Sequence, residues 1–252
     1  MPRLDQTNDE MQNFNIGKGG FAFTGARFDK LGASNYTLAT AAVDVSGSTG
    51  PFRQQLVDML KMTLDACKKN PRSDNIMFRV IIISDRFPKG VEEVHGFKPL
   101  VDIDPTVYDS IRTGGWTPLV DGCYSGVGAT NAYAKELKAR DYDSNGIVFM
   151  ITDGAENRST ATMSMLKKEL EDAVTSETLE SLISILIGIN ASEYRDELTL
   201  FQNEAGITHY KDAGDATPRN LAKLAAFVSQ SVSSTALAAG TGGPSQQIAA
   251  TI

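Results

Sequence analysis

The strongest constraint on the fold is a set of apolar runs that are rich in β-branched or small residues and do not alternate with polar ones. Four such runs lie at residues 37–45, 76–84, 146–152 and 182–189, and a shorter one lies at 208–210. Strands buried on both faces have this composition, because helices cover both sides of a parallel sheet. The runs alternate with amphipathic, helix-patterned stretches. The pattern predicts an α/β fold with a doubly wound, mostly parallel central sheet flanked by helices, similar to Rossmann-like folds.

Five stretches carry the helical pattern. The first has apolar residues at spacings of four and three, with Pro51 near its start, and these are Phe52, Leu56, Leu60, Leu64 and Cys67. The other four lie at 118–138, 163–174, 193–203 and 218–233. We expect the first helix to direct backbone N–H groups and the positive end of its dipole toward the loop that precedes it.

The chain divides into three parts. Residues 37–235 form one domain, which a chain of 252 residues can build around a single large core. Residues 1–36 are expected to be a polar start followed by a β extension, a short hairpin or edge strand packed on the domain. A weaker pattern at 91–101 is expected to be a short edge strand or hairpin. Residues 236–252, rich in Ala, Gly, Ser and Gln, are expected to be a flexible tail.

The loop after the first strand carries oxygen side chains at every second position. Residues 43–50 read VDVSGSTG, so Asp44, Ser46 and Ser48 would point to one side of an extended backbone. A carboxylate and two hydroxyls that converge at a strand end suit a hard divalent cation such as Mg2+, which prefers oxygen ligands. The alternative is that Ser48 or Thr49 only caps the following helix.

Two later turns add oxygen side chains between apolar stretches. The first is GGWTPL at 114–119, which contains Thr117, and the second is FMITDG at 149–154, which contains Asp153. In this order, the Asp-x-Ser-x-Ser loop, the threonine and the Thr-Asp-Gly turn resemble the von Willebrand factor A (vWA) family and its metal-ion-dependent adhesion site (MIDAS). The resemblance covers about residues 37–235. It implies the same doubly wound fold.

The resemblance also implies a set of metal ligands. Ser46 and Ser48 would supply hydroxyls directly and Thr117 in a state-dependent way, whereas Asp44 and Asp153 would act largely through bound waters. Two carboxylates roughly neutralise the cation, and neutral hydroxyls leave it electrophilic toward a further anionic oxygen. The expected cofactor is Mg2+, with Mn2+ or Ca2+ as alternatives. A Glu or Asp of a partner protein would complete the coordination, so we expect cation-bridged protein binding without catalysis.

Composition limits the kinds of partner and the cellular locations that fit the chain. With a net charge of −7 and no cluster of Lys and Arg, nucleic acid is a poor partner. Cys67 and Cys123 fall in helix-patterned stretches and are expected to be unpaired core residues. The start of the chain has no apolar signal region and no run is long enough to span a membrane, so we expect a cytoplasmic protein, or one exported without a standard signal, with no membrane contact.

The family divides into extracellular adhesion modules and intracellular ones. The absent signal and the unpaired cysteines favour the intracellular, prokaryotic or phage type. By analogy, that type resembles tellurium-resistance proteins or partners of AAA+ ATPases, in a stress-response or defence system.

Two other functions remain open. A Mg2+-dependent phosphohydrolase on a similar sheet would place a second Asp two residues after Asp44, where Ser46 stands. No Ser/His/Asp set is apparent, because His95 and His209 lie in weak or edge segments and are expected at the surface. The sequence GKGG at 17–20 lacks the frame of a P-loop and is expected to be a turn. The other open function is that of a structural subunit with a vestigial metal site.

Three further residues border the expected site. Trp116, the single Trp of the chain, either anchors its loop against the core or lines the ligand surface. Glu156 and Asn157 follow the Asp153 turn, and a role as cap or loop residues is favoured for both.

Overall fold

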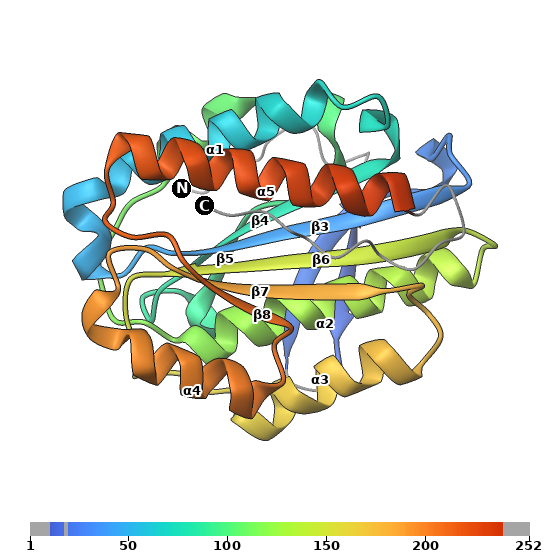
Figure 1. Cartoon of the computed structure of the whole chain (residues 1–252). Helices are drawn as coiled ribbons and strands as arrows, with labels where there is room; N and C mark the ends of the chain where they lie inside the picture. The colour runs from blue at the N-terminus through green and yellow to red at the C-terminus, as the bar shows by residue number, and fades with distance from the viewer. Residues whose placement is uncertain (1–10, 18–19, 239–252) are drawn as a thin grey trace, which may run out of the picture.

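A mixed sheet runs through the centre of the molecule (Figure 1). The computed structural model describes residues 11–17 and 20–238. Five neighbouring strands are parallel, namely β4 (Ile76–Ile83), β3 (Asn35–Asp44), β6 (Asp143–Thr152), β7 (Leu182–Gly188) and β8 (His209–Asp212). The other three are β5 (Val91–Pro99), β2 (Phe21–Ala26) and β1 (Met11–Ile16), and the sheet order is β1-β2-β5-β4-β3-β6-β7-β8. The predicted α/β fold with a doubly wound, mostly parallel sheet is confirmed.

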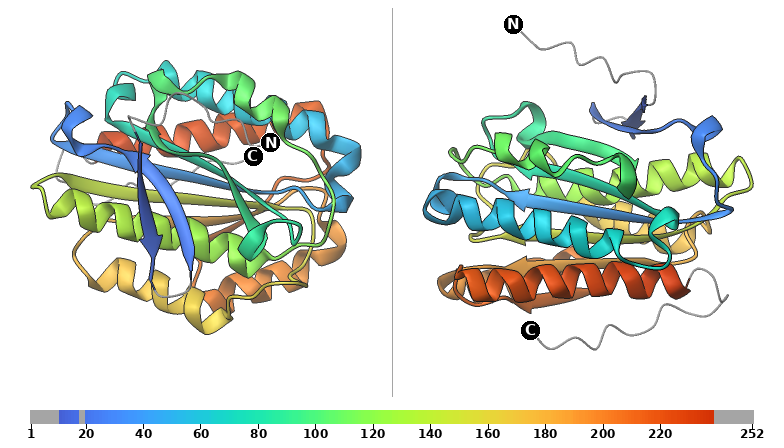
Figure 2. Two further views of the ribbon diagram at one scale, coloured as in Figure 1. Left: turned by 180° about the vertical axis from the view of Figure 1, so that it is seen from behind. Right: turned by 90° about the horizontal axis from the view of Figure 1, so that it is seen from above.

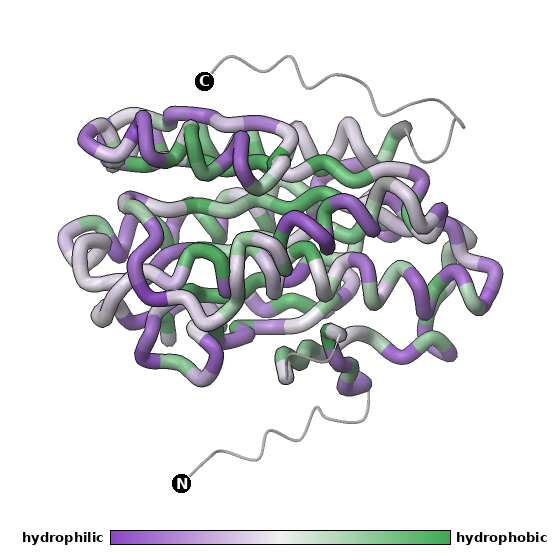
Figure 3. The backbone as a smooth tube through the Cα atoms, turned by 90° about the horizontal axis from the view of Figure 1, so that it is seen from below, coloured by the Kyte–Doolittle hydropathy of each residue, from purple (hydrophilic) through white to green (hydrophobic). Residues whose placement is uncertain are grey.

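Helices cover both faces of the sheet and enclose two apolar layers. On one face lie α1 (Arg53–Lys68) and α5 (Pro218–Ala238). On the other lie α2 (Leu119–Lys138), α3 (Met163–Thr175) and α4 (Arg195–Ala205). Figure 3 shows that hydrophobic segments lie mainly in the interior and that hydrophilic ones lie mainly on the outer turns. Cys67 in α1 and Cys123 in α2 are buried and free, as predicted. No helix within 11–17 and 20–238 combines the length and apolarity that crossing a membrane needs.

The N-terminal extension is a β-hairpin, as predicted. Strands β1 and β2 pair antiparallel, β2 joins β5 in parallel, and the hairpin packs against α2 (Figure 2). The approach of β2 to β5 is so close that a Cβ on Gly96 would lie 2.1 Å from the backbone oxygen of Thr24. Glycine is therefore required at this contact.

A buried ion pair ties the hairpin to the sheet. Arg79 of β4 is 1% exposed, and its Nε donates to Oε2 of Glu93 at 2.8 Å. The other carboxylate oxygen of Glu93 accepts from the backbone N–H and the hydroxyl of Thr24 in β2, at 2.9 and 2.6 Å. The Glu93 carboxylate thus joins β2, β4 and β5.

Two predictions about β5 are wrong. The strand is not at an edge, because β4 and β2 flank it on its two sides. His95 is not at the surface, because the helical segment η6 (Pro105–Ser110) packs against it and leaves it 7% exposed. The Nε2 of His95 is hydrogen-bonded to the Tyr108 hydroxyl at 3.0 Å, and burial lowers the pKa of the imidazole to about 4. His209, in the edge strand β8, is exposed as predicted.

The predicted ends of the domain shift slightly. Helix α5 continues to Ala238, so residues 236–238 are helical and not part of a tail. Met11 and Gln12 belong to β1, so the β extension begins within the polar start of the chain. The remaining terminal predictions, and residues 18–19 of the GKGG turn, lie outside the described residues. A 3-10 segment, η2 (Gly47–Phe52), separates the Asp44 loop from α1, so the first helical turn beside the loop belongs to η2.

Candidate metal centre

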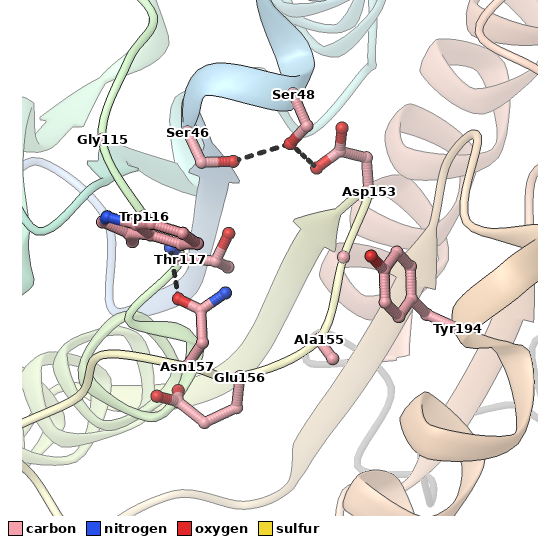
Figure 4. Close-up of a pocket in the computed structure, with 11 residues that line it drawn as sticks. Ser46, Ser48, Gly115, Trp116, Thr117, Asp153, Ala155, Glu156, Asn157 and Tyr194 are labelled. Atoms are coloured by element: carbon pink, nitrogen blue, oxygen red, sulfur yellow. Dashed lines mark hydrogen bonds between the residues drawn. The ribbon is translucent and has the colours of Figure 1, made fainter.

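The expected site lies at the point in the sheet where the strand order reverses. Strands β3 and β6 are neighbours, and the chain continues from β3 to β4 on one side and from β6 to β7 on the other. Doubly wound sheets bind ligands in the crevice at such a point, outside the carboxyl ends of the strands. Asp44 ends β3 and Asp153 follows the last residue of β6. A cleft of about 370 Å³ opens there, and Ser46, Ser48, Thr117 and Asp153 line it (Figure 4).

The two serines and Asp153 form a chain of contacts. The hydroxyls of Ser46 and Ser48 lie 3.1 Å apart, and Ser48 Oγ donates to Oδ1 of Asp153 at 2.9 Å. Neither η2 nor α1 receives a cap hydrogen bond from the side chain of its N-cap residue, and the Thr49 hydroxyl donates to the backbone oxygen of Ser46. Contrary to the capping alternative, the side chains of Ser48 and Thr49 therefore do not cap the following helix.

Asp44 is buried beneath these hydroxyls and held rigidly. It is 1% exposed; its Oδ1 accepts from the backbone N–H of Ser46 at 2.8 Å, and its Oδ2 accepts from the Thr152 hydroxyl at 2.7 Å. Burial raises the pKa of the Asp44 carboxyl, and hydrogen bonds from Ser46, Thr152 and Thr117 oppose that rise. The role of Thr152 escaped the sequence reasoning. It follows from the register, since Val43 pairs with Ile151 and the next two residues therefore lie side by side.

Thr117 reaches the site on a loop that is held by the backbone of its neighbours. Gly114 donates its N–H to the backbone oxygen of Val45 at 2.8 Å, and Gly115 accepts from Gly47 at 2.9 Å. Gly115 has φ +79°, a conformation that favours glycine. The Thr117 side chain is 4% exposed. Its hydroxyl is one of the hydrogen-bonding groups that lower the pKa of the Asp44 carboxyl. The structure therefore brings all five predicted ligands together.

The second carboxylate shows the electrostatic consequence of this arrangement. Burial and the nearby charge of Asp44 raise the pKa of Asp153 to about 6. A divalent cation between the two carboxylates would remove this repulsion, and three hydroxyls complete an all-oxygen donor set of the kind that Mg2+ prefers. Among the described residues, no three His, Cys, Asp or Glu side chains group into a metal site, so binding here depends on the hydroxyls. The residues present fit a hard divalent cation.

Glu156 and Asn157 support the loops around the site, in agreement with the role favoured from the sequence. Glu156 Oε2 accepts from the N–H of Val120 in the first turn of α2 at 2.7 Å, and its Oε1 accepts from the N–H of Ser159. Asn157 Oδ1 accepts from the N–H of Thr117 at 2.9 Å (Figure 4). Glu156 thus caps α2, and Asn157 fixes the backbone of a candidate ligand.

Two aromatic side chains flank the cleft. Trp116 is 57% exposed and stacks with the guanidinium of Arg158, 5.5 Å from its ring, so it lines the surface and does not anchor the loop in the core. Tyr194, which the sequence reasoning missed, is 40% exposed and lies on the opposite side of the cleft (Figure 4). No local motif marks Tyr194, because it reaches the site only through the packing of the segment before α4.

Comparison with known proteins supports the fold. No family profile and no curated protein matches the chain. Similar solved structures include the pilus adhesin SpaC from Lactobacillus rhamnosus GG in an open conformation, with a TM-score of 0.60 and 12% identity over 89% of this chain and 32% of that chain. A D319A mutant of the PilB minor pilin from Streptococcus sanguinis has a TM-score of 0.57 and 12% identity, over 91% and 68%. Proximal thread matrix protein 1 from the mussel byssus, with a zinc-occupied MIDAS motif, has a TM-score of 0.52 and 20% identity, over 78% and 46%.

This chain spans about a third of SpaC and about half of the mussel protein. Identities of this size show a shared fold and no more.

Proposed function

We propose that the chain is a vWA-type protein-binding module in which a divalent cation bridges the domain to a Glu or Asp of a partner protein. The observation that carries this proposal is the convergence of four oxygen side chains from three separate loops on one cleft, with the buried Asp44 carboxylate next to them. Burial and the charge of Asp44 together raise the pKa of Asp153. The mussel protein is described with a zinc-occupied MIDAS motif, which adds support from a protein of the same fold.

Each side chain has a distinct role in this proposal. The hydroxyls of Ser46 and Ser48 bind the cation from the β3 loop, and Thr117 approaches it from the loop before α2. Asp44, fixed by two hydrogen bonds, and Asp153 neutralise its charge. When bound, the cation supplies an electrophilic position for one carboxylate oxygen of the partner. We propose Mg2+ as the metal, and Mn2+, Ca2+ and Zn2+ belong in the same test.

Binding without catalysis is part of the proposal. The described residues that line the cleft include no His, Lys or Arg, and Ser46 stands where a phosphohydrolase would carry its second Asp. Turnover of a phosphate ester in the presence of Mg2+ tests this point. Activity that Asp44→Ala abolishes would establish the enzymatic alternative.

The proposed setting is cytoplasmic, within a stress-response or defence complex that contains an AAA+ ATPase or another system component. The two free, buried thiols support it, since reducing compartments keep cysteines unpaired. The neighbours named above belong by name to pili and the byssus, so fractionation of the producing cells is the direct test of location.

The test of function is capture of a partner from an extract of the producing cells, with Mg2+ or with EDTA. We expect one protein to be retained by the wild type in Mg2+ and lost in EDTA or with Asp153→Ala. Asp65→Ala, an exposed carboxylate on α1, is the matched control and should retain the partner. A partner that is indifferent to EDTA and to Asp153→Ala would contradict cation bridging and would support a vestigial site.

A further inference from the structure

Exposed hydrophobic side chains gather beside the metal cleft. Among the described residues six large hydrophobic side chains are exposed, and three of them, Trp116, Tyr194 and Leu200, line the cleft or the hollow next to it. Leu200, on α4, is 58% exposed. Single exposed apolar residues are ordinary, but a group around one cleft marks an interaction surface.

The hollow that adjoins the cleft has a volume of about 270 Å³ and lies between α4, the start of α3 and the loop after β6. We call it the α4 groove. Its apolar lining comes from Leu119, Met163, Leu198, Leu200 and Phe201. Ala155 and Glu156 line both the groove and the metal cleft, so the two hollows adjoin.

The groove carries a negative rim. Glu197 and Glu204 lie on the same side of α4 as Leu200 and Phe201, because residues spaced by three, four and seven share one helical face. Both glutamates are exposed, and neither forms an ion pair with any described residue. The nearest carboxylate on the cleft side, that of Glu156, is already occupied by backbone N–H groups.

The opposite side of the cleft has a different character. There Trp116 lies beneath the positive guanidinium of Arg158. The surface therefore runs from a basic and aromatic side, across the metal cleft and Tyr194, to an apolar groove with two unpaired acidic residues. Figure 4 shows the middle part of this surface, with Trp116 and Tyr194 on opposite sides of the cleft. A ligand segment has a preferred direction on such a surface, since its charged residues meet opposite charges in only one orientation.

We propose that the partner segment that supplies the metal-bound carboxylate continues past Tyr194 into the α4 groove, where a bulky apolar side chain packs on Leu200 and Phe201 and a Lys or Arg faces Glu197 and Glu204. The ligand is thus an acidic, then apolar, then basic stretch of a protein chain. This inference rests on the proposed function of the metal site, which it refines by naming the partner's chemistry. The position of the groove next to the cleft and the negative charge of its rim favour this occupant.

The test uses a synthetic peptide array in which one Asp is fixed and the flanking positions are varied. The full chain is applied in Mg2+ and in EDTA, and the probes are the peptides themselves. We expect binding only in Mg2+, strongest for peptides with a large apolar residue and a Lys or Arg on one side of the Asp.

Three variants locate the preference. Leu200→Ser should weaken the apolar preference about tenfold, and the double variant Glu197→Lys, Glu204→Lys should remove or reverse the basic preference. Because these side chains are exposed, both variants should fold, and both should still require Mg2+ and the fixed Asp. Asp65→Lys, on α1, should bind like the wild type.

The outcomes separate this inference from the proposed function. Peptides that bind in Mg2+ with no flanking preference, or with a preference that the α4 variants leave unchanged, would overturn the inference while the metal-bridging function stands. Binding of no peptide in Mg2+, or equal binding in EDTA, would overturn the proposed function and the inference together.

Discussion

Replacing Asp153 by Asn should stabilise the metal-free protein and abolish its response to Mg2+. The rise of the Asp153 pKa from 3.8 to about 6 means that the ionised carboxylate lowers the free energy of unfolding by roughly 3 kcal/mol at neutral pH, at about 1.4 kcal/mol per pH unit. Asn keeps an oxygen that can accept the hydrogen bond from Ser48 but carries no charge. A neutral amide oxygen accepts a weaker hydrogen bond than a carboxylate, which offsets about 1 kcal/mol of this gain. We therefore expect a net gain of about 2 kcal/mol, or about 4 to 8 °C in Tm.

The stability advantage of Asp153→Asn should depend on pH in a definite direction. A carboxyl whose pKa is raised in the folded state destabilises the fold above that pKa, and the cost disappears as the folded protein takes up the proton at lower pH. The advantage of Asp153→Asn should therefore be full above about pH 6 and should vanish as the pH falls toward 3.8.

The assay is thermal and chemical unfolding of the wild type, Asp153→Asn and the control Asp65→Asn, each in EDTA and in Mg2+. In EDTA the Asp153 variant should be the most stable of the three. In Mg2+ at a hundredfold excess over Kd the wild type should gain about 2.7 kcal/mol and overtake it. A variant that is less stable than wild type in EDTA, or that gains as much from Mg2+, would refute the electrostatic argument.

Three further predictions concern the fold that carries the site. The wild type should lose about 3 kcal/mol of its free energy of unfolding as the pH falls from 6.5 to about 4, because the buried imidazole of His95 resists protonation. His95→Gln should remove most of this pH dependence. Denaturant titrations across that range would contradict the prediction if the two proteins lost stability in parallel. Arg79→Met should cost about 3 kcal/mol in urea unfolding, because it leaves the partly buried charge of Glu93 unpaired, whereas Lys138→Met at an exposed pair should leave the unfolding midpoint nearly unchanged; equal effects would count against the buried ion pair. Gly96→Ala should cost about 1–3 kcal/mol and make the hairpin sensitive to protease, whereas Gly32→Ala, which meets no atom within 4 Å, should do neither; a stable Gly96 variant would show that β2 can move away.

What the sequence revealed was local. A strand end followed by a turn is encoded within a few residues, so the Asp44 loop, the Thr117 turn and the Asp153 turn could each be placed, and parallel strands bring such ends to one edge of the sheet. A cap or loop role for Glu156 was also predicted, but the helix that it caps, α2, lies earlier in the chain and could not be assigned from the local sequence.

What the sequence did not reveal depends on contacts between distant segments. Thr152 supports Asp44 only because of the register of β6 against β3, and Tyr194 reaches the cleft from the segment that precedes α4. His95 was expected at the surface because its strand has a weak pattern. A hairpin pairs with one side of that strand and η6 packs over His95, and neither contact is visible in the local sequence.

The most direct measurement is a calorimetric titration of the metal-free protein with Mn2+, with Mg2+ in competition, for the wild type, Ser48→Ala, Asp153→Ala and Asp65→Ala. The account predicts one ion per wild-type and Asp65→Ala chain, displaced by Mg2+, and at least a tenfold loss of affinity in the other two variants. Absence of binding to the wild type, or binding that the Ser48 and Asp153 substitutions leave unchanged, would contradict a cation held by these five residues.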